Sequence, residues 1–350
     1  MNAARPGEAL AVGFDGTSLP EDLLAFARDA GLGGVVLFAR NCPTVQAVLA
    51  LTAASRRLGP DVLVLVDHEG GRVHRLPPPF TRFPPAAAVG RAGDPALAGA
   101  VARAMARELR AAGFDSGLAP VLDCLTDPRN AAIGDRAFAT DPETVAACGV
   151  AFVRAALETG LIPVAKHFPG HGRTAVDSHL ALPEIDVPSD ALDALELVPF
   201  RRALAAGCPA VLVAHARYPA LDAAWPASLS ASVIDGLLRR RLGFTGLVLS
   251  DDLEMRAVAG TWGVGTAAAR FLEAGGDLLL VCRDAGARDA ALEAVRELPG
   301  AGRLSLEAAR ARRAGLRALV SRGGPPPDAA VIGCVEHREL AEEVARRGTQ

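Results

Sequence analysis

The sequence predicts an α/β protein, a (β/α)8 TIM-type barrel that carries helical appendages at its C-terminal end. Short apolar runs alternate with helical patterns along the chain, and eight such units can be counted. Half of the 350 residues are hydrophobic, so a large core can form. This length is ordinary for one barrel of this type. We therefore expect one large domain.

Eight apolar runs mark the expected strands. They lie at residues 9–14, 34–38, 62–67, 117–122, 163–167, 209–215, 247–250 and 277–282. A doubly wound open sheet is the rival architecture, but it would usually carry a glycine-rich dinucleotide turn after its first strand. The segment Gly13-Phe14-Asp15-Gly16 matches that turn poorly. The pattern therefore favours the barrel.

The expected helices lie between these runs and show apolar residues spaced by three and four. Helix starts are expected at Asp94-Pro95 and Asp141-Pro142. Helix stops are expected at Gly113, Gly160 and Gly207.

The C-terminal part reads as an addition to the barrel. Residues 305–322 form an arginine-rich amphipathic pattern, residues 323–327 a glycine- and proline-rich surface connection, and residues 336–347 a last helix. We therefore divide the chain into a catalytic barrel, residues 1–322, and residues 323–350. The second part is expected to be a connection and a helix that is packed on the barrel or partly mobile.

Charge and composition exclude several classes of protein. The net charge is -3 and lysine is almost absent beside arginine, so the chain lacks the basic footprint of a nucleic-acid-binding protein. Residues 1–8 show no signal-peptide pattern, and no apolar stretch is long enough to span a bilayer. We expect a cytoplasmic protein, favour a monomer, and predict a small-molecule substrate.

The six cysteines are scattered. They lie at positions 42, 124, 148, 208, 282 and 334. No Cys-x-x-Cys pair occurs, so neither a disulfide framework nor a zinc site is indicated.

Ionisable residues gather at the ends of four expected strands. They are Asp67, Lys166, His167, His215, Asp251 and Asp252. In a (β/α)8 barrel the active site forms at the C-terminal ends of the strands. A solvated loop residue or a helix N-cap would explain any one of them, but their convergence on one rim predicts a functional site.

The segment 166–179 packs three histidines into a loop rich in glycine and proline. A metal site is one interpretation, but helical HExxH spacing and accompanying cysteines are missing, so we expect no metal. The other interpretation is that these histidines carry out acid/base chemistry. Asp177 can accept a hydrogen bond from one imidazole nitrogen of His179 and fix its tautomer, which leaves the other nitrogen to transfer protons near neutral pH.

Five motifs carry a resemblance to a known family. They are GVVLFARN at 34–41, DHEGGRV at 67–73, IGDR at 133–136, KHFPGHGRTAVDSH at 166–179 and LSDDLEM at 249–255. In their order and spacing, over about residues 9–320, the chain resembles the single-domain bacterial β-N-acetylhexosaminidases of glycoside hydrolase family 3, which recycle cell-wall fragments. The combination of KHFPGHG with DSH is a highly specific signature.

The resemblance implies a retaining mechanism. It makes Asp251 the nucleophile that attacks the anomeric carbon and forms a covalent glycosyl-enzyme. It makes His179 the general acid and base, oriented by Asp177, where most glycosidases use a carboxylic acid. The implied activity is removal of terminal β-linked N-acetylglucosamine, with no cofactor.

The resemblance also implies a set of sugar-binding residues. They are Asp67, Arg75, Arg136, Lys166 and His167. Arg136 could instead form only a surface salt pair with Asp135, and Arg75 could be a solvated basic residue. We interpret Glu69 and Arg72 as structural partners inside the rim. We expect His215 to lie behind the residues that touch substrate. We expect Asp123 to be a buried acid that accepts hydrogen bonds.

The sequence departs from the family pattern at two positions, and both departures concern fine specificity. Position 68 is His where family members commonly carry Gln, and Glu254 stands where many relatives have a small residue.

Three alternatives stay open at the level of sequence. β-Glucosidases of the same family usually take their acid/base carboxylate from a second domain, for which this chain leaves no length, so the 177–179 loop is the available source. A phosphorylase would use phosphate in place of water, and His179 would tolerate that anion. A noncatalytic sugar-binding barrel should have lost Asp251 or His179, yet both are present.

Overall fold

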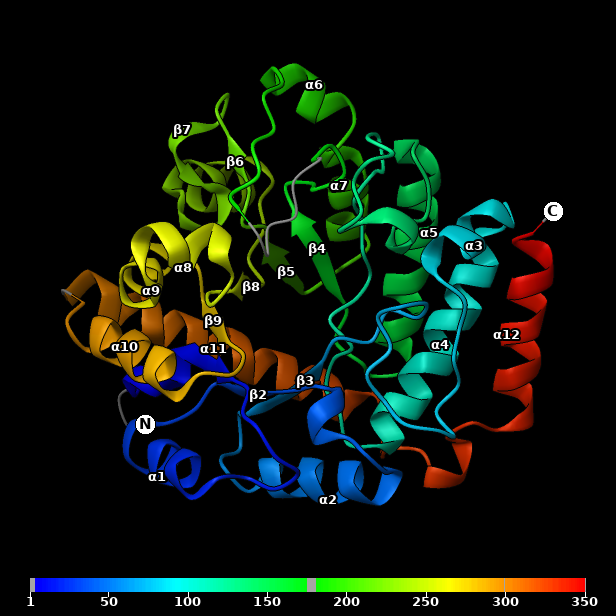
Figure 1. Ribbon diagram of the computed structural model, residues 1–350, viewed down its shortest axis with the longest axis horizontal. Coiled ribbons are helices and arrows are strands. Elements are labelled where there is room, and N and C mark those ends of the chain that lie inside the picture. The colour runs from blue at the N-terminus through cyan, green and yellow to red at the C-terminus, as the bar shows by residue number, and fades with distance from the viewer. Residues whose placement is uncertain (1–3, 175–180, 299, 350) are drawn as a thin grey trace.

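The computed structural model describes residues 4–174, 181–298 and 300–349, and it confirms the (β/α)8 barrel class (Figure 1). Seven parallel strands curl around a centre in the order β3-β2-β1-β9-β8-β5-β4. They are β1 (Leu10–Val12), β2 (Gly34–Leu37), β3 (Leu63–Val66), β4 (Val164–Phe168), β5 (Ala210–Val213), β8 (Leu247–Asp252) and β9 (Leu278–Val281).

The strand predicted at residues 117–122 does not form, and this prediction was wrong. The segment nevertheless fills the eighth position of the barrel. Ser116 bridges to Leu65 in parallel, and Val121 bridges to Lys166 on β4. Regular pairing fails here because Pro120 has no N–H to donate and Leu118 lies at φ 45°, in the left-handed region.

Helices surround the barrel on its outside. They are α1 (Glu21–Ala30), α2 (Val45–Arg56), α3 (Ala86–Arg91), α4 (Pro95–Ala111), α5 (Pro142–Glu158), α6 (Ser189–Ala194), α7 (Leu197–Ala205), α8 (Arg256–Trp262), α9 (Val264–Glu273), α10 (Ala285–Arg296), α11 (Gly300–Arg322) and α12 (Val335–Arg347). A π-helix spans Ser232–Arg241. An antiparallel hairpin, β6 (Arg217–Tyr218) and β7 (Asp222–Pro226), follows β5.

Short 3-10 helices complete the structure. They are η1 (Pro6–Ala9), η2 (Ala39–Asn41), η3 (Gly134–Arg136), η4 (Ala227–Leu229) and η6 (Ala329–Val331). The predicted helix starts are confirmed, since the side chains of Asp94 and Asp141 accept hydrogen bonds from the first turns of α4 and α5. The predicted stops at Gly113, Gly160 and Gly207 have φ values of 89°, 74° and 89°, which suit glycine.

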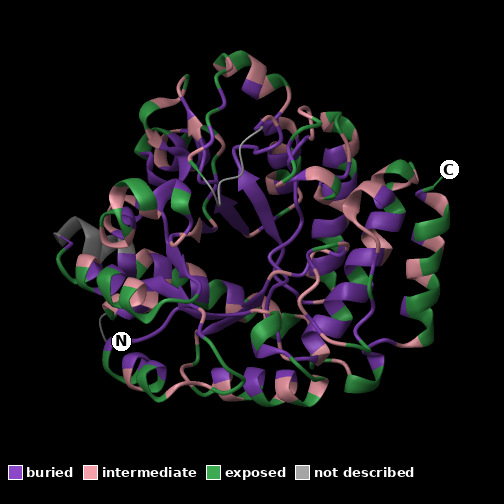
Figure 2. Ribbon diagram, in the orientation of Figure 1, coloured by how far each residue is buried: buried purple, intermediate pink, exposed green. Residues whose placement is uncertain are grey.

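Two apolar layers hold the barrel together. One lies between the strands and the surrounding helices, and the other fills the barrel interior with side chains such as Val36, Leu65 and Leu249. Figure 2 shows the strands buried and the outward faces of the helices exposed. This arrangement leaves the ends of the strands as the place where polar side chains can meet.

Helix α11 closes the barrel at the N-terminal ends of the strands. Leu316 packs into the interior layer. Arg312 pairs with the buried carboxylate of Asp277 at 2.5 Å, and Arg317 pairs with the buried carboxylate of Asp115. The helix begins at Gly300, five residues before the predicted start.

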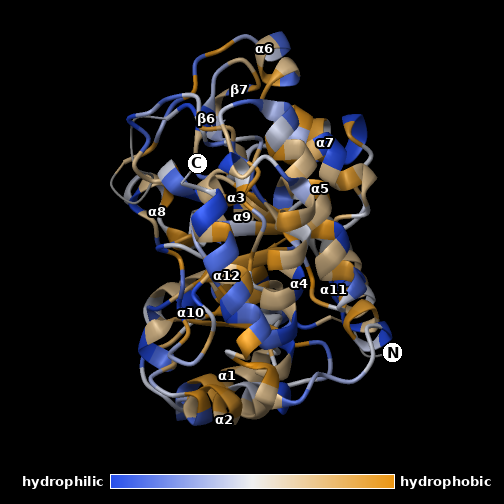
Figure 3. Ribbon diagram, turned by 90° about the vertical axis from the view of Figure 1, so that its right-hand side faces the viewer, coloured by the Kyte–Doolittle hydropathy of each residue, from blue (hydrophilic) through white to orange (hydrophobic). Residues whose placement is uncertain are grey.

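Helix α12 lies against α3 and α4 (Figure 3). His337 Nδ1 lies 2.8 Å from Glu108 Oε1, and Arg347 pairs with Asp94 at 3.0 Å. Within the described residues, no helix is long and apolar enough to cross a membrane.

Candidate active site

A cavity of about 180 Å³ opens at the C-terminal ends of the strands. All six of the predicted site residues that the structure describes line it. They are Asp67, Arg75, Arg136, Lys166, His167 and Asp251. The two remaining predicted catalytic residues, Asp177 and His179, lie outside the described residues.

One wall of the cavity is an ion network built on Glu69. Lys166 lies between Asp67 and Glu69, with Nζ 2.9 Å from Asp67 Oδ1 and 2.5 Å from Glu69 Oε1. Burial opposes the charge of Lys166, but the two carboxylates outweigh it and raise the pKa of the lysine. Burial likewise opposes ionisation of Glu69, and Lys166 and Arg136 hold its pKa below the ordinary range.

Arg136 pairs with Glu69 and not with Asp135. Two hydrogen bonds of 2.8 Å join its Nε and Nη2 to the two oxygens of Glu69. Asp135 instead pairs with Arg72 at 3.0 Å. Glu69 and Arg72 both form ion pairs, as expected, but the pair of Arg72 is half-exposed and the Glu69 carboxylate lines the cavity. The surface-pair alternative for Arg136 is therefore wrong.

His167 is held between an acid and a cation. Its Nδ1 lies 2.7 Å from Oδ2 of the buried Asp123, and its Nε2 lies 3.3 Å from Arg136 Nη2. Because a guanidinium can only donate, Nε2 accepts and the proton sits on Nδ1. Asp123 also accepts from the backbone N–H of His171 at 2.6 Å. The interpretation of Asp123 as a buried hydrogen-bonding acid is confirmed.

Arg75 has hydrogen-bonding capacity to spare. It lines the cavity, and its buried Nε has no hydrogen-bond partner within the described residues. A buried, unsatisfied donor costs free energy unless a ligand or water satisfies it. This guanidinium is therefore suited to bind a polar group that enters the cavity.

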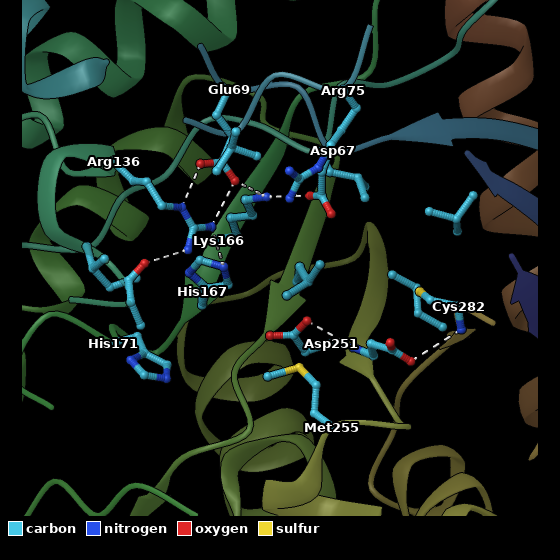
Figure 4. A pocket seen from close by; sticks show the side chains of 18 of the residues that line it. Asp67, Glu69, Arg75, Arg136, Lys166, His167, His171, Asp251, Met255 and Cys282 are labelled. Atoms are coloured by element: carbon cyan, nitrogen blue, oxygen red, sulfur yellow. Dashed lines mark hydrogen bonds and ion pairs between the residues drawn. The ribbon is translucent and has the colours of Figure 1, made fainter. Parts of the chain in front are cut away.

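Asp251 lies opposite this wall, at the end of β8 (Figure 4). Its Oδ1 accepts a hydrogen bond from the backbone N–H of Asp252 at 2.9 Å. Burial favours the neutral form, but His215 and His167 outweigh it and hold the pKa of Asp251 below its usual value. Asp251 is therefore an ionised carboxylate at neutral pH.

His215 supports the end of β8 from behind. Its Nδ1 lies 2.7 Å from Ser228 Oγ, and its Nε2 lies 3.0 Å from the backbone oxygen of Asp252. His215 does not line the cavity, as expected for a residue behind the substrate contacts.

Sequence reasoning missed several residues that line the cavity. They are Phe38, His171, Met255 and Cys282. Phe38 and Cys282 end predicted strands, His171 belongs to the histidine-rich segment and Met255 to the LSDDLEM motif, but none of them was singled out as a site residue. Asp252 was expected at this rim without an assigned role, and it also lines the cavity. Within the described residues, no group of three or more potential ligands could hold a metal ion.

The arrangement suits a small polar molecule without net charge. Hydrogen-bond donors and acceptors crowd one wall, an ionised carboxylate faces them, and apolar side chains such as Phe38 and Met255 complete the lining. Lys166 and Arg136 are already paired with carboxylates, whereas Nε of Arg75 has no hydrogen-bond partner among the described residues. Hydroxyl and amide groups can bind to such a wall without adding charge.

Comparisons with known proteins agree with this geometry. Residues 18–314 match the glycosyl hydrolase family 3 N-terminal domain. The β-hexosaminidase of Methylococcus capsulatus is 43% identical over 285 residues, which are 80% of this chain and 84% of that protein. The β-hexosaminidase of Xylella fastidiosa is 41% identical over 322 residues, which are 90% of this chain and 91% of that protein.

Solved structures give the same result. The family 3 β-N-acetylglucosaminidase of a Paenibacillus species has a TM-score of 0.93 and 35% identity, with 98% of this chain and 68% of that one covered. NagZ from Neisseria gonorrhoeae, in complex with N-trifluoroacetyl-D-glucosamine, has a TM-score of 0.82 and 32% identity. The match covers 99% of this chain and 100% of that one. This chain therefore belongs to glycosyl hydrolase family 3.

Proposed function

We propose that this protein is a retaining exo-β-N-acetylglucosaminidase that removes terminal β-linked N-acetylglucosamine from cell-wall muropeptide fragments in the cytoplasm. The broader activity, that of a β-hexosaminidase, is the one named for its relatives in Methylococcus and Xylella. One observation carries the finer proposal. An ionised Asp251 faces, across one cavity, all five residues to which the family resemblance assigns sugar binding.

The first step is attack by Asp251 on the anomeric carbon. One of its oxygens, Oδ1, is held by the N–H of Asp252. Oδ2 is therefore the oxygen that forms the ester while the glycosidic bond breaks. His179 gives its proton to the departing oxygen, so that an alcohol leaves.

The second step reverses these roles. His179, now neutral, takes a proton from water, and the resulting hydroxide attacks the anomeric carbon. The bond to Asp251 breaks, and the sugar leaves with its β-configuration retained. Asp177 fixes the imidazole tautomer that both steps need. In this proposal residues 1–322 form the catalytic unit, the protein acts as a monomer, and no metal or cofactor takes part.

The polar wall binds the terminal sugar. Arg75 offers an Nε that has no hydrogen-bond partner within the described residues, and Asp67 binds Lys166 through Oδ1. The complex of Neisseria NagZ with N-trifluoroacetyl-D-glucosamine supports an N-acylated sugar as the ligand class. We assign the donors and acceptors of this wall to the hydroxyl and acetamido groups.

Proton NMR of the early products tests this proposal. With an aryl β-N-acetylglucosaminide in phosphate buffer, we expect free N-acetylglucosamine to appear first as the β-anomer. First appearance of the α-anomer would contradict the retaining mechanism, and N-acetylglucosamine 1-phosphate would identify a phosphorylase. Binding of the sugar without turnover would identify a noncatalytic barrel.

A further inference from the structure

The end of β8 brings two successive carboxyl groups into one cavity. Neighbouring side chains of a regular strand point to opposite faces. Here Leu249 pairs with Leu278 and Asp252 pairs with Leu280, so three steps along β8 match two along β9. This irregularity, of the kind that re-aims side chains beside active sites, lets both Asp251 and Asp252 line the cavity. The mechanism above uses only Asp251.

The two oxygens of the Asp252 carboxyl have different surroundings. Oδ1 accepts backbone N–H groups from Glu254 at 3.1 Å and from Cys282 at 3.3 Å. These two donors orient the carboxyl plane. Oδ2 has no hydrogen bond within the described residues, which leaves it available to a ligand.

The charges around Asp252 disfavour a further negative charge. The ionisable groups of the neighbouring elements are Asp67, Asp251, Glu254, Cys282, Arg283, His215 and Arg40. Two of the basic groups are engaged elsewhere, since Arg40 and Arg283 pair with Asp15. Nε2 of His215 contacts the backbone oxygen of Asp252, not its carboxyl group.

This environment keeps a proton on Asp252 at mildly acid pH. Burial, aided by the carboxylates of Glu254 and Asp251, raises the pKa of Asp252 to about 7. Since Oδ1 already accepts two N–H groups, the proton belongs on Oδ2. A protonated Oδ2 is a hydrogen-bond donor.

We propose that Asp252 is a further substrate-binding residue of this cavity, which, as the neutral acid, donates a hydrogen bond from Oδ2 to an oxygen of the bound sugar. This proposal rests on the proposed function, because the sugar is the one that Asp251 attacks. The proton stays on Asp252 throughout. Ionisation of Asp252 replaces the donor by an acceptor and removes the bond.

Calorimetric titration with N-acetylglucosamine between pH 5.5 and 8.5 tests the proposal. The sugar is uncharged, so any change of affinity with pH comes from the protein. The wild type is compared with Asp252→Asn, which keeps the shape and an N–H donor but cannot titrate, and with Asp252→Ala, which removes the donor. All other titrating groups are common to the three proteins, so differences between them report on position 252.

We expect the wild-type affinity to fall by about 3- to 10-fold as the pH rises through 7, the effect of losing one hydrogen bond. Asp252→Asn should lack this decrease. Asp252→Ala should bind more weakly than the wild type at pH 5.5 by a similar factor. Circular dichroism checks that each variant is folded, and Asp252→Asn decides the question if the alanine variant does not fold.

The proposal is overturned if Asp252→Asn and the wild type show the same pH dependence. It is overturned equally if a folded Asp252→Ala binds as tightly as the wild type at pH 5.5. The same experiments distinguish a failure of the proposed function from a failure of the role proposed for Asp252. Binding with the expected dependence on Asp252 but without hydrolysis overturns the function alone, whereas wild-type protein that does not bind the sugar overturns both.

Discussion

Arg136 joins Glu69 through two parallel hydrogen bonds of 2.8 Å, across 67 positions of sequence. Both side chains are largely buried, at 16% and 6% exposure. Glu69 also holds Lys166, so one carboxylate positions two of the cations that line the cavity.

Glu69→Gln should therefore lower the free energy of unfolding by about 3–5 kcal/mol, because it leaves buried charge without its partner. We also expect KM to rise more than kcat falls, since Arg136 and Lys166 lose their positions. Urea unfolding and steady-state kinetics measure the two effects. Asp135→Asn breaks the exposed pair with Arg72 and should cost less than about 1 kcal/mol. Equal losses in the two variants would contradict the role of Glu69.

Asp251→Asn should leave folding and sugar binding nearly intact and lower kcat at least about a thousandfold. The neutral amide cannot form the glycosyl ester. Asp29→Asn, at an exposed position on α1, serves as the matched control and should keep full activity. A fluorinated N-acetylglucosaminide that traps the intermediate should label Asp251. Mass spectrometry that locates the label on Asp252 would move the nucleophile by one residue.

His179→Ala should slow a substrate with a poor, alkoxide-like leaving group severely. A substrate with an activated phenol needs little protonation, so its glycosylation step should lose much less. Asp177→Asn should fall between the wild type and His179→Ala, because it alters the tautomer without removing the proton donor. Pre-steady-state rates on both substrates provide the measurement. Equal losses on the two substrates would reassign the loop to substrate positioning.

His68→Gln should make the protein less sensitive to acid. His68 and His74 lie with ring centroids 4.5 Å apart, and burial lowers their pKa values to about 3 and about 4. The unfolded chain takes up these protons below about pH 6.5, whereas the folded protein does not. This contribution to stability is complete above pH 6.5 and is lost as the pH falls toward the folded values.

At pH 5 the stability lost through His68, relative to pH 7, amounts to about 2 kcal/mol. Urea unfolding at pH 7 and pH 5 should show that the wild type loses about 2 kcal/mol more than His68→Gln between the two conditions. His337→Gln, at a buried histidine paired with Glu108, is the comparison variant. A pH-dependent loss as large in His68→Gln as in the wild type would contradict this account.

The sequence by itself determined the barrel class, several helix ends and, with the family resemblance, six residues of the cavity. Apolar runs report burial directly, and Asp94 and Asp141 cap helices through contacts within their own turns. Four of the site residues could be predicted because a parallel barrel brings the ends of its strands to one rim. Arg75 and Arg136 were assigned only through the family resemblance. Asp67 and Asp251 are such strand ends, so their position along the chain implies their position in space.

Only the tertiary structure decided the pairings and irregularities on which the chemistry depends. The partner of Arg136 is Glu69 rather than its neighbour Asp135, because folding brings distant segments together and buries the better pair. The segment 117–122 is not a strand, although its composition is apolar. The irregular pairing after Leu249 turns Asp252 into the same cavity as Asp251. Such features follow from packing between segments far apart in sequence, which local patterns do not record.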